Sequence, residues 1–162
     1  MSVGMTESAK RGTVLSCCIS VKKGTRKVPV DSIEVCVGEG IKGDAHAGNW
    51  HRQVSLLGNE SVDTMREKGA ELHPGDFAEN ILTSGLALRE LPVGTVLAIG
   101  DTLLAVTQIG KVCHHDCEIR KLVGTCVMPT EGIFTVVLRG GTIKSGDTIC
   151  VVDAKELLHE TN

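Results

Sequence analysis

The sequence predicts a mostly β, barrel-like α+β fold with one main helix and short accessory helices. About seven short runs are rich in β-branched and small apolar residues, and glycine bounds most of them. Only one segment combines a helical pattern with signals for both helix ends. Strands and helices do not alternate regularly, so the pattern excludes a doubly wound parallel sheet.

Three of the expected strands lie in the first part of the chain. The run "TVLSCCIS" contains no breaker, "SIEVCV" alternates with the period of a strand, and "VSLL" is typical of a short buried strand. These runs cover residues 13–20, 32–37 and 54–57. We expect the basic stretch "VKKGTRKVPV" to be a loop or a hairpin arm.

Four further strand-like runs lie in the second half of the chain. They cover residues 95–100, 102–110, 132–141 and 147–153. Gly–Asp turns lead into two of them, which is typical of small barrels in which a hairpin returns across the closing edge.

The main helix is expected from Asn59, as its cap, to about Lys68, with Gly69 just past its end. Val62 and Met65 fit its inner face. Residues 114–122 are expected to form one or two helical turns, and residues 153–160 a short terminal helix. The stretches 38–53 and 72–86 are predicted to be irregular, and long ordered loops are often functional.

The chain of 162 residues is large enough for one domain with its own core. We expect a flexible lead over residues 1–11, a single domain over 12–152 and a helix or tail over 153–162. The first residues lack the apolar core of a signal peptide, and no run is long enough to span a bilayer. The sequence therefore predicts a cytoplasmic protein with reduced thiols and no membrane partner.

Charge and composition give no reason to expect a nucleic-acid partner. The formal net charge is −3, and aromatic residues make up only 2% of the chain. Nucleic-acid binding usually needs a basic surface and, for single strands, stacking platforms.

The stretch "KVCHHDCEIRKLVGTCVMP" concentrates sulfur and imidazole, in Cys113, Cys117, Cys126 and two histidines. Thiolates and imidazoles bind zinc, but a structural zinc site usually shows two clear ligand pairs. A reactive thiolate is the second interpretation, because Lys111 and the histidines favour ionisation of Cys113. Ordinary burial as a small apolar residue is the third, and it suits the four cysteines within predicted strands, Cys17, Cys18, Cys36 and Cys150.

The two predicted loops carry polar side chains suited to ligand binding. The first contains Lys42, Asp44, His46 and Arg52 among glycines, and Lys and Arg recognise anions such as phosphate. A solvated turn ordered by Asp44 explains the same residues. The second loop, "HPGDFAEN", carries Glu79 and Asn80, which suit either a ligand or the order of the loop itself.

Five segments follow one another along the chain: "GIKGDAHAG", "RQVSLLGNESVD", "HPGDFAENILTSGL", "LPVGTVLAIGDTLLAVTQIGKVC" and "GIFTVVLRGGTIKSGDTI". In this order and spacing they resemble the MOSC domain, named for the C-terminal domain of molybdenum-cofactor sulfurases. The resemblance runs from about Gly12 to Val152, and its most specific part is "PGDFAEN". The chain looks like the compact single-domain bacterial members.

The resemblance implies a β-barrel with a cleft for the molybdenum cofactor (molybdopterin) or for sulfur transfer. The family's functional cysteine falls on Cys113, as a persulfide carrier or a ligand to molybdenum. Four residues are implied to line the cleft, namely Asp44, His46, Glu79 and Asn80. The cofactor's terminal phosphate suits three cations, namely Lys42, Arg52 and Lys111.

Two features depart from the family pattern. Ala78 replaces a glycine that is common at this position, and Cys117 and Cys126 add sulfur that the reductase-type relatives lack. These two accessory thiols leave open whether Cys113 acts alone, since a cysteine pair resolves a persulfide through a transient disulfide.

Three functions remain open on the sequence. The first is binding of the molybdenum cofactor, or sulfur carriage for metal–sulfur centres, with cofactor-biosynthesis or sulfur-donor proteins as partners. The second is a molybdenum-dependent reductase of N-hydroxylated compounds with external redox partners. The third is a non-catalytic binding module stabilised by zinc. Pyridoxal phosphate is not expected, because it belongs to a separate domain of larger sulfurases. The sequence does not fix the oligomeric state.

Overall fold

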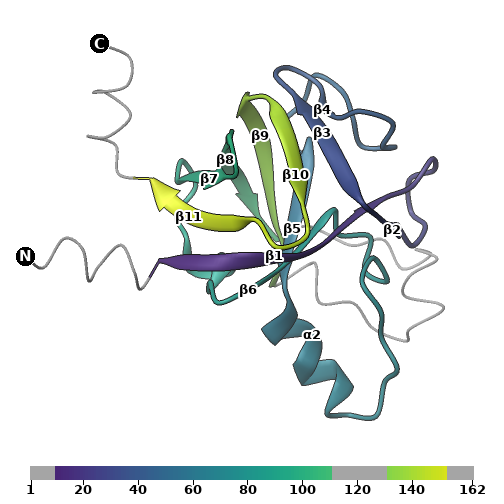
Figure 1. The fold of residues 1–162 in the computed structure, drawn as a ribbon. Helices are drawn as coiled ribbons and strands as arrows, with labels where there is room; N and C mark the ends of the chain where they lie inside the picture. Colours follow the sequence, from purple (N-terminus) through teal and green to yellow (C-terminus); the bar gives the residue numbers. More distant parts are fainter. Residues whose placement is uncertain (1–9, 111–130, 153–162) are drawn as a thin grey trace, which may run out of the picture.

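The computed structural model describes residues 10–110 and 131–152, and within them it confirms the mostly β fold (Figure 1). Its elements, in chain order, are β1 (Arg11–Ile19), β2 (Val28–Val30), β3 (Ser32–Cys36), β4 (Gly40–Ile41), β5 (Val54–Gly58), α2 (Asn59–Arg66), β6 (Ile81–Ser84), the 3-10 helix η1 (Leu88–Glu90), β7 (Val96–Ile99), β8 (Thr102–Ile109), β9 (Ile133–Arg139), β10 (Gly141–Lys144) and β11 (Thr148–Val152).

Seven strands close into a barrel in the order β11-β7-β8-β9-β5-β6-β1, and β1 pairs back onto β11. The closure depends on the length of β1. Its first residues pair with β11, with Arg11 opposite Cys150, while its middle residues pair with β6. Its last residues, Cys17 to Ile19, pair with β2, which extends beyond the barrel. One strand thus joins the barrel's closing seam to the segment 20–30, which carries β2 and is called the β2 arm below.

Most neighbouring barrel strands are antiparallel, but β5 and β6 are parallel. The connection between them contains α2 and the loop 72–80, so the helix projects from one end of the barrel (Figure 1). A parallel pair needs such a crossover, because a tight hairpin reverses direction. The functional candidates Glu79 and Asn80 lie at the end of this crossover.

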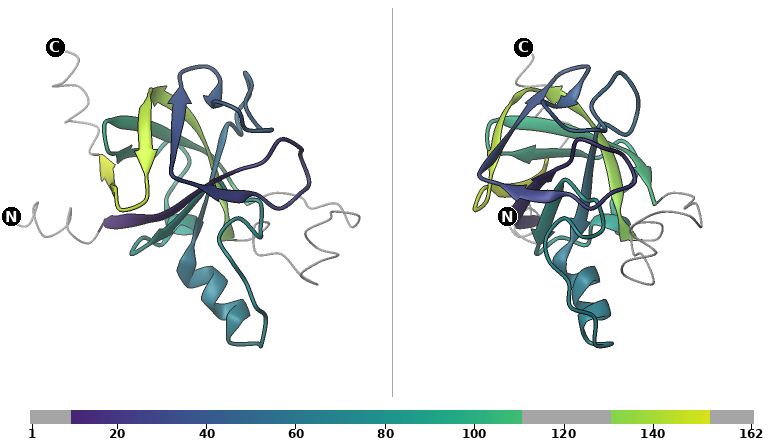
Figure 2. Two further views of the ribbon diagram at one scale, coloured as in Figure 1. Left: turned by 45° about the vertical axis from the view of Figure 1, so that its right-hand side comes forward. Right: turned by 90° about the vertical axis from the view of Figure 1, so that its right-hand side faces the viewer.

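A smaller sheet in the order β10-β3-β4 lies beside the barrel (Figure 2). Its buried side chains Ile33, Ile41 and Ile143 belong to the same apolar cluster as the barrel residues Leu56 and Leu104. Burial of each such side chain contributes about 1.5–3 kcal/mol. One continuous core therefore holds both sheets together.

A second apolar cluster lies between α2 and the outside of the barrel. Val62 of α2 packs there with Phe77 and Phe134, and Met65 is packed against the same cluster. The predicted inner face of the helix, Val62 and Met65, is confirmed. Three of its members, Phe77, Ala78 and Phe134, also line a small cavity beside the loop 42–53.

Three short strands differ from the sequence-based expectation. Residues 40–41 and 81–84 pair as β4 and β6 within stretches predicted to be irregular, and residues 141–144 form β10. Each is short and borders glycine, so its local pattern is weak and tertiary pairing decides its structure.

The helix also starts one residue earlier than expected. Gly58 takes the cap position, and the side chain of Asn59 accepts a hydrogen bond from Arg66 instead.

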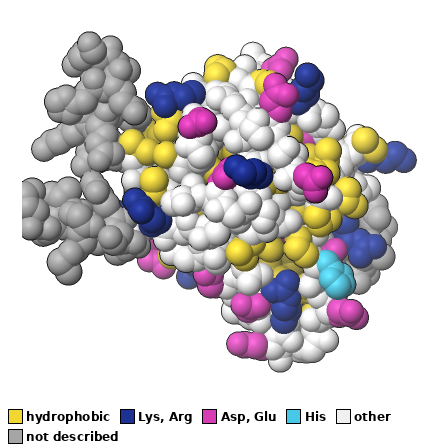
Figure 3. Space-filling model, in the orientation of Figure 1, with side chains coloured by type: hydrophobic (Ala, Val, Ile, Leu, Met, Phe, Trp, Pro, Cys, Tyr) yellow, Lys and Arg dark blue, Asp and Glu magenta, His cyan; other side chains and the backbone are white. Residues whose placement is uncertain are grey.

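The face shown in Figure 3 intersperses basic with acidic side chains and exposes hydrophobic ones among them. Val28, the first residue of β2, is 61% exposed, and Val21, which lies just after β1, is 88% exposed. In the described part of the chain, no helix is long and apolar enough to cross a membrane.

Gly75 connects the arm to the crossover loop, and this contact is testable. Its carbonyl accepts the amide of Lys27 at 2.8 Å, its φ is +88°, and an added Cβ would overlap the Lys27 carbonyl. Gly75→Ala should therefore lower the free energy of unfolding by about 3 kcal/mol or more, measured by urea denaturation. Gly94→Ala is the matched control, because its φ is +98° with no atom nearby. It should cost only about 1–2 kcal/mol. Equal losses in the two variants would contradict the close packing at Gly75.

Candidate functional site

The loop 42–53 lies against the end of β1 on one side and against β8 on the other. Ala45 donates its amide to the Ser20 carbonyl at 2.8 Å, just past β1. His51 Nε2 lies 2.7 Å from Gln108 Oε1, and Thr107 Oγ1 donates to the His51 carbonyl. These contacts order a stretch that is rich in glycine and polar residues. They also hold it beside the end of β8.

A buried ion pair holds the loop from below. Lys27 Nζ lies 2.8 Å from Asp44 Oδ1, and both side chains are fully buried. Asp44 also accepts the amides of Ser20 at 3.1 Å and of His46 at 3.0 Å. The carboxylate therefore joins the β1 end, the β2 arm and the loop at one point.

The charges of this pair depend on each other. Burial opposes the ionisation of Asp44, but interactions with His46 and Lys27 outweigh it and hold the pKa of Asp44 well below its usual range. Burial lowers the pKa of Lys27, and the hydrogen bond to Asp44 opposes this effect. Removal of either partner would leave a buried unpaired charge.

The indole ring of Trp50, in the same loop, contacts both cationic and imidazole side chains. The His46 ring stacks on it with centroids 6.2 Å apart and planes 3° apart. Arg52 Cζ lies 4.6 Å from the Trp50 centroid and 5.4 Å from that of Phe134, and Lys23 Nζ lies 4.9 Å from Trp50. Cations over aromatic faces are attracted by the ring quadrupole. The His51 ring meets the same indole edge-on at 6.0 Å, so four nitrogen-bearing side chains surround it.

Arg52 is half-buried, and no carboxylate pairs with it among the residues that the structure describes. With respect to the described residues, its guanidinium therefore has hydrogen-bond donors available for another partner. Together with His46 it borders a small cavity of about 10 Å³, room for about one water molecule. The other residues lining this cavity are Ser55, Phe77, Ala78, Asn80 and Phe134.

Asn80 is fully buried beneath this cavity and joins three strands. Its Oδ1 accepts the Ser55 amide at 3.0 Å, and its Nδ2 donates to the Cys18 carbonyl at 3.1 Å. Its backbone also accepts the Cys18 amide at 2.7 Å. The side chain thus has protein partners on both its oxygen and its nitrogen.

Glu79 is enclosed by its own loop. Its carboxylate accepts the amides of Gly75 at 2.7 Å and Phe77 at 3.2 Å. Ala78 adopts a left-handed φ of 62° to close this turn, at the position where the family pattern commonly has glycine. Burial raises the pKa of Glu79 to about 7, although hydrogen bonds from the backbone amides of Gly75, Phe77 and Glu79 itself oppose the rise.

The structure brings together some of the residues predicted from the sequence. His46, Arg52 and Asn80 border one cavity, with Asp44 below His46. Lys42 is exposed just after β4, and only its amide bond to the Glu34 carbonyl is described. Four predicted site residues lie outside the described residues, namely Lys111, Cys113, Cys117 and Cys126. The roles of all these residues as ligand contacts stay predictions.

The sequence reasoning missed Lys27 and Trp50. Trp50 carried a usable signal, because it is the chain's single tryptophan and lies in a glycine-rich loop between histidines. Lys27 carried none. It belongs to a basic run in which Lys22, Lys23 and Arg26 look alike, and only the fold buries one of the four.

The chain leaves the described region close to this site. Gly110 donates its amide to the Gly132 carbonyl at 2.7 Å and accepts Gln108 Nε2 at 2.7 Å. The side chain of Gln108 is the one that contacts His51. Cys113 follows Gly110 by three residues in the sequence. The loop 42–53 is therefore linked to the start of the cysteine-containing segment.

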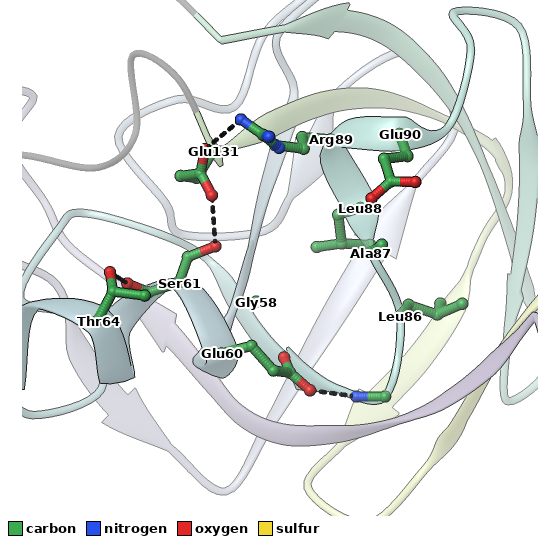
Figure 4. Close-up of a pocket in the computed structure, with 11 residues that line it drawn as sticks. Gly58, Glu60, Ser61, Thr64, Leu86, Ala87, Leu88, Arg89, Glu90 and Glu131 are labelled. Atoms are coloured by element: carbon green, nitrogen blue, oxygen red, sulfur yellow. Dashed lines mark hydrogen bonds and ion pairs between the residues drawn. The ribbon is translucent and has the colours of Figure 1, made fainter.

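A second cavity, of about 400 Å³, lies between α2 and η1 (Figure 4). Most of its charged side chains are already satisfied. Glu131 accepts Ser61 Oγ at 3.1 Å and pairs with Arg89 at 2.9 Å, while Glu60 accepts the Gly85 amide at 2.7 Å. We therefore place the candidate site at Arg52 and His46 and not at the larger cavity, because Arg52 has no acidic partner within residues 10–110 and 131–152.

The described cysteines are free thiols, and two of them are poor nucleophiles. Burial raises the pKa of Cys17 to about 11 and that of Cys18 to about 12, as expected for small core residues. Cys36 and Cys150 are only partly buried. No group of three or more His, Cys, Asp or Glu side chains within residues 10–110 and 131–152 is arranged to hold a metal ion.

A closed seven-stranded barrel with a smaller sheet beside it defines the class of this chain as a small β-barrel domain. The chain belongs to the MOSC domain family, whose model matches residues 43–150. This family is associated with binding of the molybdenum cofactor. No curated protein sequence matches the chain.

Solved structures share the fold at low sequence identity. The YuaD protein of Bacillus subtilis superposes with a TM-score of 0.73 at 20% identity, over 87% of this chain and 95% of that one. YiiM of Escherichia coli gives 0.63 at 19% identity, over 88% and 70% of the two chains. YiiM of Geobacillus stearothermophilus gives 0.62 at 19% identity, over 88% and 73%. The barrel architecture is therefore common to all three.

The raised pKa of Glu79 predicts a pH-dependent stability. With an ordinary pKa of 4.5 when unfolded and about 7 when folded, the folded chain holds this proton more tightly. The stabilisation is present below about pH 4.5 and is lost as the pH rises through 7. Glu79→Gln lacks this titration. Between pH 5 and pH 8 the wild-type chain should lose about 2 kcal/mol of unfolding free energy that the variant does not lose. Urea denaturation of both proteins at the two pH values measures this difference. A pH-independent difference would show that Glu79 stays ionised throughout.

The buried ion pair predicts strong coupling between its two members. Lys27→Met and Asp44→Leu should each cost about 3–5 kcal/mol, because each leaves a buried unpaired charge. The double variant removes both charges, so its loss of unfolding free energy should be smaller than the sum of the two single losses by about 2 kcal/mol or more. Unfolding curves of the wild type, the two single variants and the double variant measure this coupling. Additive losses would contradict the pairing.

Proposed function

We propose that this chain binds the molybdenum cofactor through the loop 42–53 and carries sulfur for metal–sulfur centres as a persulfide on Cys113. The observation that carries this proposal is Arg52, half-buried between two aromatic rings and without an acidic partner among the described residues. It lies in the region matched by a cofactor-associated family. It also lies in the loop that is linked through Gln108 to the start of the segment containing Cys113.

The residues present fit the anionic end of such a cofactor. Arg52 and Lys23 place two positive charges over the indole ring of Trp50, and His46 adds a ring nitrogen beside them. A planar guanidinium donates to phosphate in a bidentate manner. Arg52 would therefore hold the terminal phosphate, with Lys23 adding charge and Trp50 keeping both cations in place.

The bound cofactor would supply a molybdenum centre, and a soft cysteine thiolate is a suitable ligand for it. The protein's own contribution is to bind the phosphate, orient the pterin and exclude water from the cavity beneath. Asn80 supports this floor, because its side chain is already bonded to Cys18 and Ser55.

Sulfur carriage needs only a thiolate and a donor persulfide. The Cys113 thiolate would attack the outer sulfur of a persulfide on a donor protein. The donor's S–S bond breaks, the donor leaves as a thiolate, and a new S–S bond forms on Cys113 without net oxidation. Cys17 and Cys18 do not suit this step, because their raised pKa values disfavour the thiolate.

The proposal is tested by anaerobic purification from a host that makes the cofactor and from one that does not. Molybdenum and the oxidised, fluorescent pterin should accompany the wild-type chain from the first host only. Cys113→Ser should lose most of the molybdenum and the persulfide label, whereas Cys36→Ser, a half-buried thiol in β3, should keep both. Arg52→Ala should weaken cofactor retention by about tenfold or more, because a charge-assisted hydrogen bond contributes about 1.5–3 kcal/mol. Lys22→Ala is the matched surface control.

Two results would overturn the proposal. One is stoichiometric zinc that persists through purification with no pterin from the competent host, which favours a zinc-stabilised module. The other is equal behaviour of the Cys113→Ser and Cys36→Ser variants, which removes any special role from Cys113.

A further inference from the structure

The ammonium group of Lys27 is surrounded by three acceptors. Nζ lies 3.0 Å from Ser20 Oγ, 2.8 Å from Asp44 Oδ1 and 3.1 Å from His46 Nδ1. An ammonium has three N–H donors and no lone pair. Each donor therefore has one acceptor, and the third acceptor is a ring nitrogen of His46.

This arrangement determines where the imidazole carries its proton. Nδ1 accepts from Lys27 only if it is unprotonated, so the ring proton of neutral His46 resides on Nε2. The competing arrangement has Nδ1 donating to Asp44 Oδ2. Those atoms are 3.7 Å apart, too far for a hydrogen bond, and Oδ2 already accepts the His46 amide at 3.0 Å. A protonated Nδ1 would also direct an N–H of the ring at the ammonium of Lys27.

The ring is held in this orientation by Trp50. The two rings are stacked almost parallel, and Trp50 Nε1 donates to the His46 carbonyl at 2.8 Å. With Nδ1 turned to Lys27, Nε2 is the ring nitrogen left for another partner, and the ring borders the same small cavity as Arg52.

We infer that Lys27 is a positioning residue that fixes His46 as the Nε2–H tautomer, so that His46 and Arg52 together donate hydrogen bonds to an oxyanion. The inference rests on the proposed function and deepens it by naming the donor atom and the ligand chemistry. An imidazole locked as an N–H donor favours phosphate-like or oxo groups, which accept hydrogen bonds, over ligand groups that only donate.

The tautomer is measured directly on the wild-type chain by two-bond ¹⁵N–¹H NMR correlation of the histidine rings, with His46→Gln identifying the signals. The expected spectrum shows a protonated Nε2 and an unprotonated Nδ1 at pH 8. A protonated Nδ1 in the wild-type chain overturns the inference without any further variant.

Two variants separate Lys27 from its ion-pair partner. In Lys27→Met the ammonium is gone and the Asp44 carboxylate remains, so the proton should move to Nδ1. In Asp44→Asn the ammonium remains, so Nε2 should stay protonated. If Asp44→Asn moves the proton, Asp44 sets the tautomer and the role assigned to Lys27 is wrong. The change in ring signals is one that a general loss of stability does not produce.

The ligand is tested with inorganic phosphate as the probe. Titration should shift the His46 Nε2 signal and change the fluorescence of Trp50, which is the chain's single tryptophan in a sequence without tyrosine. Arg52→Ala should weaken the phosphate response by about tenfold or more. No response to phosphate in a chain with the expected tautomer overturns the oxyanion assignment. A chain that binds phosphate in this way but never retains molybdenum would keep the inference and reject the proposed cofactor.

Discussion

The side chain of Asn80 is the contact on which barrel and site both depend. It is fully buried at the start of β6, where it bonds the backbone of β1 through Cys18 and that of β5 through Ser55. An apolar residue at this position would leave those backbone groups without partners, at a cost of about 1–3 kcal/mol each. Because Asn80 also borders the small cavity with His46 and Arg52, the same amide that fixes the strands forms the floor of the candidate site.

A second constraint connects three segments that are far apart in the sequence. Lys27 and Asp44 hold the arm and the loop together by charge, while the amide of Lys27 is bonded to the Gly75 carbonyl of the crossover loop. Gly75 in turn donates its amide to Glu79. The residues that resemble the family's cleft motifs therefore act here first as fold determinants. Arg52 differs from them, because it has no acidic partner in the part of the chain that the structure describes.

Most of the barrel could be predicted from the sequence, because its long strands show alternation or unbroken β-branched runs, and these patterns can be read without knowing the tertiary contacts. Short strands such as β6 could not, since four residues beside glycine carry little pattern of their own. The same division holds in the site. Asp44 and His46 stood out in a glycine-rich loop, whereas the burial of Lys27 follows from tertiary contacts with Ser20 and Gly75 that no local signal encodes.

Pro29 in β2 has a consequence for self-association. This strand pairs with β1 alone among the described strands, and it carries the exposed Val28, so its outer edge resembles a template for strand addition. Cys18 is paired with Pro29 but turns its amide to Asn80, away from β2. The backbone nitrogen of Pro29 therefore faces the open edge, where an ordinary residue would offer an N–H. Proline removes that donor, and the apolar edge is protected from sheet-to-sheet aggregation.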